Sequence, residues 1–304
     1  MFFYENISFF RCLVIFTYFM GVIFDSGLNL MKNIYITDLD HTFLRNDLSV
    51  SPYTKKVWND KAHNSILSVA TARTYKKTAE FLKEIHISVP MILLDGALIA
   101  TMDRKIIDTK FINKEIGDVI VDEGLKFGIT PFILAMTDSQ NLSEAFIYST
   151  VLNQHQVEVL SRYRGDDNLQ KLKNIRAMDE NFKIVYMGEE QLLRSLHIHL
   201  QKMFGDTLKF ILAPEAYVGC YFLTILNLEA DKSHGIESVR EYCDFDLENL
   251  SVFGDNLNDL GMFKLAKISI AVANAHDELK SHADIILPHT NDEDGVAKYL
   301  EGIR

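Results

Sequence analysis

Asp38 and Asp40 stand two positions apart and directly follow a short β-branched and aromatic segment at 33–37. Such a segment has the composition of a buried strand, although an Asp-x-Asp pair by itself is also common in turns and helix caps. In open parallel sheets, ligands bind at the carboxyl ends of the strands. Two neighbouring carboxylates repel one another unless a cation or a shared proton separates them. Because Mg²⁺ prefers oxygen ligands and takes few carboxylates together with phosphate, the pair predicts a magnesium and phosphate site.

Gly254 and Asp255 follow another predicted strand, at 250–253. Glycine allows the backbone to turn tightly and to approach a ligand closely. Asn258 and Asp259 then fall at the start of a predicted helix, where backbone N–H groups attract anions. A helix cap would explain one of these acidic residues and leave the others without a role. We therefore expect this segment to complete the site that the first pair of aspartates begins.

The order of four motifs resembles the haloacid dehalogenase (HAD) superfamily, specifically its Cof-like sugar-phosphatase branch with a type IIB cap. The resemblance extends from about Met31 to the C-terminus. The motifs are Asp38-Leu39-Asp40-His41-Thr42, Thr71-Ala72-Arg73, Lys232, and Gly254-Asp255-Asn256-Leu257-Asn258-Asp259. His41 and Ala72 stand where the family pattern has glycine, and neither change removes a catalytic group.

The resemblance implies hydrolysis through an aspartyl-phosphate. Asp38 would be the nucleophile, and Asp40 would protonate the leaving alkoxide and then deprotonate the hydrolytic water. The implied Mg²⁺ ligands are the Asp38 side chain, the Asp40 backbone carbonyl and Asp255, with Asp259 supporting them indirectly. The implied phosphate ligands are the side chains of Thr71, Lys232 and Asn258 and the backbone N–H groups of Leu39 and Ala72.

Alternating strand and helix patterns predict a doubly wound α/β fold with a mainly parallel sheet. The predicted strands are 33–37, 66–70, 91–94, 251–253, 268–272 and 284–287. Between about 98 and 222 the alternation is interrupted by a segment that has apolar clusters of its own. The resemblance implies a Rossmann-like catalytic core at 31–97 and 223–304, with an inserted α+β cap at 98–222 that selects the leaving group.

The composition argues against nucleic acid as a partner. The chain of 304 residues has 31 Lys and Arg against 42 Asp and Glu, a net charge of −11, and no long basic run. Cys12, Cys220 and Cys243 have neither metal-binding nor disulfide spacing, which indicates a reducing, cytoplasmic location.

Residues 1–30 differ from the rest of the chain because 9–24 are strongly apolar. A signal segment or membrane anchor is one interpretation, but the apolar part after Arg11 is shorter than the roughly 20 residues that a spanning helix needs. We favour a translation start at Met31, because the first predicted strand follows it at once and needs nothing upstream. A membrane partner is then not expected.

We therefore expect a Mg²⁺-dependent phosphatase that acts on a small phosphorylated metabolite. Sugar phosphates are the commonest substrates of the resembled branch, and nucleotide-like and cofactor phosphates stay open. Tyr163, Arg164 and Asp166 are candidates for leaving-group contacts. The alternatives are a phosphotransferase or phosphomutase and a non-catalytic phospho-acceptor protein, although a phospho-acceptor needs no general acid such as Asp40. The sequence sets no oligomeric state.

Overall fold

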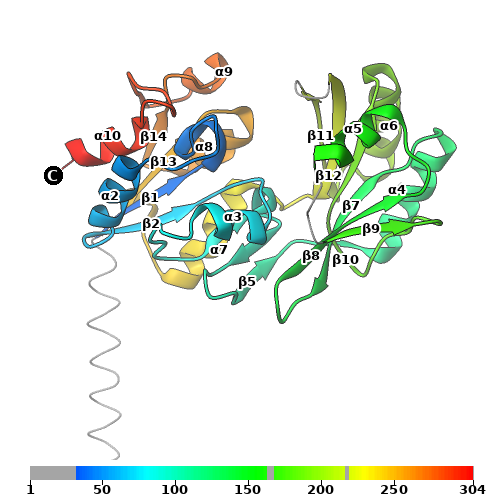
Figure 1. The fold of residues 1–304 in the computed structure, drawn as a ribbon, viewed down its shortest axis with the longest axis horizontal. Helices are drawn as coiled ribbons and strands as arrows, with labels where there is room; N and C mark the ends of the chain where they lie inside the picture. The colour runs from blue at the N-terminus through cyan, green and yellow to red at the C-terminus, as the bar shows by residue number, and fades with distance from the viewer. Residues whose placement is uncertain (1–31, 163–167, 216–218, 304) are drawn as a thin grey trace, which may run out of the picture. The chain divides into compact units, whose positions relative to one another are not determined.

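The computed structural model describes residues 32–162, 168–215 and 219–303 (Figure 1). The expectations for residues 1–30 and for the loop candidates at 163–166 lie outside these ranges. The described residues form two compact units. The first contains the residues up to Ser68, Ile85–Val89 and those from Arg240 onward, and the second contains Val69–Glu84 and Pro90–Val239. Over the described ranges, no helix combines the length and the apolar character needed to cross a bilayer.

A five-stranded sheet lies at the centre of the first unit. Its strands, in spatial order, are β15 (Ile285–Ile286), β14 (Ile268–Ala271), β13 (Leu250–Gly254), β1 (Asn33–Thr37) and β2 (Ser65–Val69). β1 is parallel to β13, β13 to β14, and β14 to β15. The strand order therefore reverses between β1 and β13, which is the switch point where such sheets bind ligands. The predicted α/β class with a mainly parallel sheet is confirmed.

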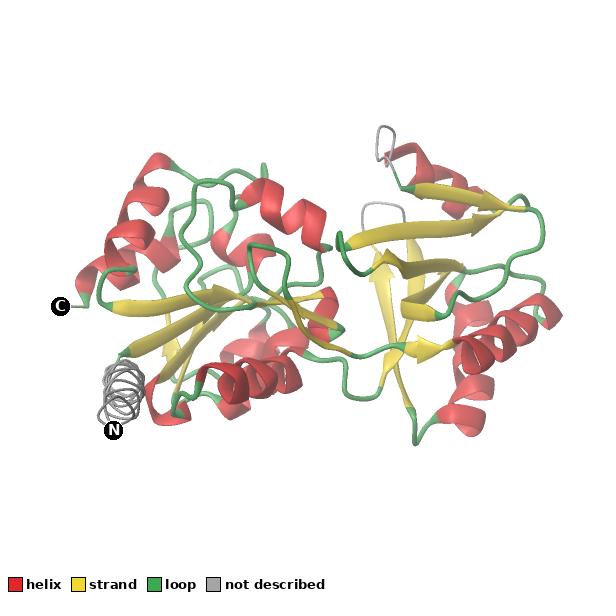
Figure 2. Ribbon diagram, turned by 90° about the horizontal axis from the view of Figure 1, so that it is seen from below, coloured by secondary structure: helices red, strands yellow, loops and turns green. Residues whose placement is uncertain are grey.

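Helices lie on both sides of this sheet (Figure 2). They are α2 (Pro52–Lys61), α8 (Leu260–Leu265), α9 (Asp277–Lys280) and α10 (Gly295–Gly302), with short helical turns η1 (Leu39–Phe43), η3 (Leu247–Asn249) and η4 (Leu257–Asp259). The start of α2 is capped: the Ser51 hydroxyl accepts a hydrogen bond from the Thr54 N–H at 3.0 Å, and Pro52 occupies the first turn. Such a cap satisfies a backbone donor that has no partner within the helix.

The third predicted strand forms, but its pairing differs from the simple alternation. β3 (Met91–Leu93) pairs antiparallel with β4 (Leu98–Ala100), and β4 pairs with β5 (Ile106–Thr109). A single parallel bridge, Ala70–Ile92, links β3 to the chain that follows β2. The turn η2 (Leu94–Gly96) explains the reversal, because three successive residues have φ values of 53°, 56° and 90° and fold the chain straight back.

A seven-stranded sheet dominates the second unit. Six strands follow the order β11 (Leu208–Glu215), β12 (Cys220–Asn227), β10 (Glu180–Gly188), β7 (Phe132–Asp138), β8 (Ser143–Ser149) and β9 (Leu169–Leu172), and β6 (Ile112–Asn113) pairs with β10. The helices of this unit are α3 (Tyr75–Phe81), α4 (Lys114–Lys126), α5 (Gln154–Arg162), α6 (Glu190–Phe204) and most of α7 (Lys232–Cys243). Two apolar clusters of the segment that interrupts the alternation, at 131–136 and 182–187, fall largely in strands β7 and β10.

The core of the second unit lies between this sheet and the helices α4 and α6. Alternate strand residues such as Ile133, Ile184 and Ile225 pack against Ile120 and Leu196 of the helices. α4 and β10 approach closely at Gly124, where an added Cβ would lie 2.3 Å from the Tyr186 hydroxyl. Glycine at this helix position therefore makes room for the buried ring of Tyr186, whose hydroxyl donates to the Ile120 carbonyl at 2.7 Å.

Tyr186→Phe should lower the free energy of unfolding of the second unit by about 1 kcal/mol, because the substitution removes one buried hydrogen bond without changing the ring. Urea denaturation measures the change. Tyr242→Phe is the control, since that side chain is 48% exposed and exposed substitutions have small effects. An equal effect of both variants would contradict a structural role for the Tyr186 hydroxyl.

Candidate active site

The pairing of β1 with β13 sets the position of the first two candidate carboxylates. Thr37 pairs with Phe253, and the Asp38 N–H donates to the Phe253 carbonyl at 2.9 Å. Asp38 therefore leaves β1 at the same edge of the sheet where Asp255 follows β13. Residues 217 positions apart in the sequence are neighbours because parallel strands end on the same side.

Three carboxylates gather at this edge. Oxygen atoms of Asp38, Asp255 and Asp259 all lie within 4.8 Å of one another. Asp38 is 6% exposed and Asp259 is fully buried, so bulk water screens their charges poorly. Carboxylates this close repel one another unless a cation or a proton compensates them. A compact set of oxygen donors suits Mg²⁺, and the site residues therefore fit the predicted ion.

Asp259 also fixes the loop that carries Asp255. Its Oδ2 accepts hydrogen bonds from the Asp255 N–H at 2.9 Å and from the Asn256 N–H at 3.1 Å. The Asn256 side chain caps the turn η4 in return. An added Cβ at Gly254 would lie 2.5 Å from this same Oδ2, so the position requires glycine. The loop is thus held by its own polar groups.

The turn η1 follows the first carboxylate and contains Asp40, which is half-buried. Thr42 donates to Asp255 Oδ1 at 3.2 Å, which ties the turn to the second carboxylate. His41 has a φ of 57°, in the left-handed region that favours glycine. The glycine that the family pattern has at this position therefore has a conformational reason. His41 adopts this left-handed conformation at some cost in backbone strain.

Two asparagines, to which the sequence analysis assigned no role, position this turn. Asn274 donates through Nδ2 to the His41 carbonyl at 2.7 Å and accepts from the Asn291 N–H at 2.9 Å. The buried Asn291 side chain donates to the Leu44 carbonyl at 3.0 Å. Asn274 lies in the loop after β14, and Asn291 lies in the loop after β15. The local signal for each in the sequence is an asparagine in the loop that follows a strand.

A polar cavity of about 340 Å³ adjoins this edge of the first unit and is lined by Asp255, His41, Asn274 and Asn291, among others.

Arg45, in the loop beyond η1, forms a two-point ion pair with Asp294, at 3.2 Å and 2.7 Å. Burial raises the pKa of Asp294, but hydrogen bonds from Arg45, Ser51 and Thr54 outweigh burial and lower the pKa below its usual value. Asp294 therefore stays ionised and anchors the loop.

The remaining predicted phosphate ligands are Thr71, Ala72 and Lys232 of the second unit, and Leu39 and Asn258 of the first. Thr71 is fully buried, and its hydroxyl oxygen accepts from the Arg73 N–H at 3.2 Å. Ala72 is exposed. Leu39 is fully buried within η1, and Asn258 is exposed in η4. Their contacts with phosphate stay predictions.

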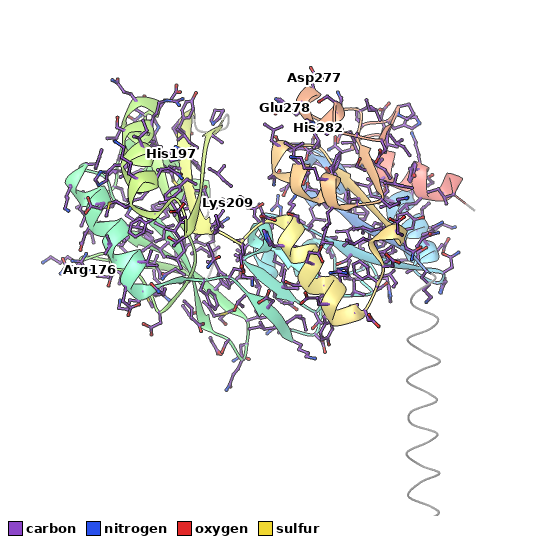
Figure 3. The ribbon with its side chains drawn as sticks, turned by 180° about the vertical axis from the view of Figure 1, so that it is seen from behind. Arg176, His197, Lys209, Asp277, Glu278 and His282 are labelled. Atoms are coloured by element: carbon purple, nitrogen blue, oxygen red, sulfur yellow. The ribbon has the colours of Figure 1, made fainter. Side chains whose placement is uncertain are left out.

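Lys232 begins α7 and is 1% exposed, which is unusual for a lysine. The preceding residue, Asp231, holds this helix start: its carboxylate accepts from the His234 N–H at 2.9 Å and forms an ion pair with Lys209 at 3.3 Å. Figure 3 labels Lys209. Burial raises the pKa of Asp231, but hydrogen bonds from Ser233 and His234 and the charge of Lys209 lower it to about 2.

Residues 35–300 match the model of one family, described as haloacid dehalogenase-like hydrolase. The chain belongs to this family. The predicted resemblance is thus confirmed, and the chain is a HAD-type hydrolase of the phosphatase kind.

Two curated relatives of this HAD-like hydrolase come from Bacillus subtilis, and both are named 5-amino-6-(5-phospho-D-ribitylamino)uracil phosphatase. One is 25% identical over 290 residues, with 89% of this chain and 97% of the relative covered. The other is 20% identical over 267 residues, with 87% of this chain and 94% of the relative covered.

Solved structures share the fold. A crystal structure of a protein from Thermotoga maritima has a TM-score of 0.74 at 23% identity and covers 90% of this chain and 98% of its own. A haloacid dehalogenase-like hydrolase from Bacteroides thetaiotaomicron has a TM-score of 0.72 at 21% identity, with 90% and 100% covered.

Asp231→Asn should destabilise the HAD-like hydrolase by about 1 kcal/mol at pH 7, because the charge that holds the start of α7 is lost. The folded-state pKa lies below the ordinary value of 3.8, so the charge stabilises the fold fully above about pH 4. This contribution disappears as the pH falls towards 2. Urea unfolding of both proteins between pH 7 and pH 3 should show a shrinking difference, and a constant difference would contradict the assignment.

Proposed function

We propose that the protein is a Mg²⁺-dependent phosphatase that hydrolyses small phosphate monoesters, sugar phosphates among them, through an aspartyl-phosphate on Asp38. The observation that carries this proposal is the compact group of the buried Asp38 and Asp259 and the half-buried Asp255 at the switch point of a parallel sheet. A phosphate monoester is a dianion, so attack by a carboxylate requires charge neutralisation and accurate positioning. Bound Mg²⁺ would supply much of that neutralisation.

The proposed reaction has two steps. In the first, an Asp38 oxygen bonds to phosphorus, the ester P–O bond breaks, and the leaving oxygen takes a proton from Asp40. In the second, Asp40 takes a proton from water, the water oxygen bonds to phosphorus, and the bond to Asp38 breaks. The products are the free alcohol and inorganic phosphate. The half-buried position of Asp40 in the turn η1, two residues after Asp38, supports this division of roles.

The other assignments follow the family resemblance. We propose that the Asp38 side chain, the Asp40 carbonyl and Asp255 bind the metal, with Asp259 supporting the loop of Asp255. Lys232, Thr71, Asn258 and the backbone N–H groups of Leu39 and Ala72 would bind phosphate. The support for Lys232 is its burial, because water screens the charge of a buried ammonium group poorly and the charge therefore acts strongly on an anion.

We further propose that residues 31–97 and 223–304 act as the catalytic core, that 98–222 act as the cap that selects the leaving group, and that the enzyme works in the cytoplasm. The cysteine spacing in the sequence, which fits neither a metal site nor a disulfide, supports the last point. The names of the two Bacillus subtilis relatives specify a phosphorylated ribityl chain attached to a uracil ring. That compound therefore belongs in the first substrate panel, beside sugar phosphates and cofactor phosphates.

Phosphate release from this panel should require both Mg²⁺ and Asp38. Asp38→Asn preserves the size of the side chain but removes the nucleophile, so kcat should fall by roughly 10³-fold or more. Colorimetric phosphate measurement with and without EDTA tests both requirements. Full activity of Asp38→Asn would refute the mechanism. Transfer of phosphate to an added sugar, with none released to water, would identify a phosphotransferase.

Asp255→Asn should raise the Mg²⁺ concentration needed for half-maximal activity by at least about tenfold, because the variant loses a charged metal ligand. A Mg²⁺ titration of the initial rate measures the shift. The matched control is Asp60→Asn: Asp60 is an exposed carboxylate in the last turn of α2, before β2 begins and so at the opposite edge of the sheet. An unchanged titration for Asp255→Asn would show that the metal site is elsewhere.

A further inference from the structure

The second unit contains a cavity of about 300 Å³ whose lining residues all belong to that unit. One wall is the segment 72–77, which follows Thr71. The other wall is one face of the seven-stranded sheet. Cavities that bind small organic ligands have volumes of about 300–1,000 Å³, so this one has room for an organic group as well as for a phosphate.

The sheet wall is apolar. Along each strand, alternate residues point to opposite faces, so the neighbours of the core residues Ile133, Ile184 and Ile225 line the cavity. Four adjacent strands, β12, β10, β7 and β8, contribute to it. The six apolar residues of this wall are Phe132, Leu134, Phe146, Val185, Met187 and Phe222. Three of the six are phenylalanines. Phe132 is buried against Val159 of α5, whereas Phe146 and Phe222 are half-buried and their rings can stack on a flat ligand.

An unsubstituted sugar matches such a wall poorly. A sugar carries a hydroxyl group on almost every carbon, and each hydroxyl that is buried without a partner costs about 1–3 kcal/mol. A heteroaromatic ring, by contrast, has two apolar faces and keeps its polar atoms at the edge. The wall therefore favours a ring that lies flat on the phenylalanines and turns its polar edge to the few polar side chains of the cavity.

Glu144 is the most buried of those polar side chains, at 4% exposure. Its Oε1 accepts from the Tyr75 N–H at 3.0 Å, and Thr224 and Lys183 line the same cavity. Burial raises the pKa of Glu144 to about 7, against the opposing effects of the Tyr75 N–H and Lys183. Near neutral pH the carboxyl group is therefore protonated in a large fraction of molecules and can donate to a ring carbonyl as well as accept from a ring N–H.

The wall formed by the segment 72–77 is basic and suits an anion. Arg73, Lys76 and Lys77 belong to this segment, and the Lys183 ammonium group lies 3.5 Å from the Ala72 carbonyl. Ala72 is the residue whose backbone N–H is proposed to bind phosphate, and it forms part of the cavity wall. A ligand that fills the cavity is therefore anionic near Ala72 and flat and apolar against the sheet.

We propose that this cavity holds the leaving group and that the preferred substrates are phosphate monoesters of sugars or polyols that carry a heteroaromatic ring. The proposal rests on the proposed phosphatase function and narrows its substrate class. Phe146 stacks on the ring, Glu144 binds its polar edge, and the segment 72–77 lies beside the phosphorylated end. Plain hexose and pentose phosphates contact the basic wall only and bind more weakly.

Matched substrate pairs test this directly. Uridine 5′-monophosphate and ribose 5-phosphate share a phosphorylated ribose, and flavin mononucleotide and ribitol 5-phosphate share a phosphorylated ribityl chain, so each pair differs chiefly in the ring. We expect kcat/KM to be about tenfold or more higher for the ring-bearing member of at least one pair. Equal or higher kcat/KM for the ring-free member of both pairs would overturn the proposal.

Phe146→Leu should lower kcat/KM for the ring-bearing substrates about two- to tenfold and leave the ring-free substrates unchanged. Phe210→Leu is the matched control, because Phe210 is a half-buried phenylalanine on β11 that packs on the helix-covered core. Its ring stacks on the His197 ring, with 5.6 Å between the ring centroids. Figure 3 labels His197. An equal loss for both substrate types in Phe146→Leu would overturn the proposed stacking.

Binding separates failure of this proposal from failure of the phosphatase function. The same four compounds are titrated calorimetrically into the Asp38→Asn variant, which retains the whole cavity. Tighter binding of the ring-bearing compounds supports the cavity assignment even where the wild-type enzyme releases no phosphate. Binding that does not distinguish the two members of either pair overturns the assignment, even where the enzyme proves to be an active phosphatase.

Discussion

The parallel pairing of β1 with β13 is the constraint on which the candidate active site depends. It brings Asp38 and Asp255 from opposite ends of the sequence to one edge of the sheet, at the point where the strand order reverses. Carboxylates at this distance oppose folding unless something compensates their charge. The same repulsion makes the site strongly attractive to a divalent cation. The electrostatic cost of bringing these carboxylates together would therefore contribute to the proposed affinity for metal.

The loops at this edge are fixed mainly by hydrogen bonds between side chains and backbone groups. Asp259 holds the loop of Asp255, and Asn274 and Asn291 hold the turn that carries Asp40. This arrangement leaves little apolar contact near the carboxylates and keeps the surroundings polar. Pre-organised polar groups cost little reorganisation when charge moves during a reaction. A site that binds and transfers phosphate benefits from such pre-organised polar groups.

Local patterns in the sequence were sufficient to predict the strands of the parallel sheet, because buried strands have short runs of β-branched residues. They did not predict the antiparallel pairing of β3. That pairing depends on positive φ values at Leu94 and Asp95, two positions without the glycine that normally indicates such a turn. The motifs predicted Asp38, Asp255 and Asp259 as site residues, and the structure brings their carboxylates together. The Asn291 contact with Leu44 spans 247 positions and has no local signature.

The second unit uses the two faces of one sheet for different purposes. Helices α4 and α6 cover one face and form a core, whereas the other face presents phenylalanines and Glu144 to a cavity. The chain carries a net charge of −11, yet the residues beside Ala72 are basic, so attraction for an anionic substrate is local. Every phosphate monoester presents the same dianion to these cations. In the proposed binding mode, discrimination among substrates therefore comes from the apolar face, where the alcohol portions of the substrates differ.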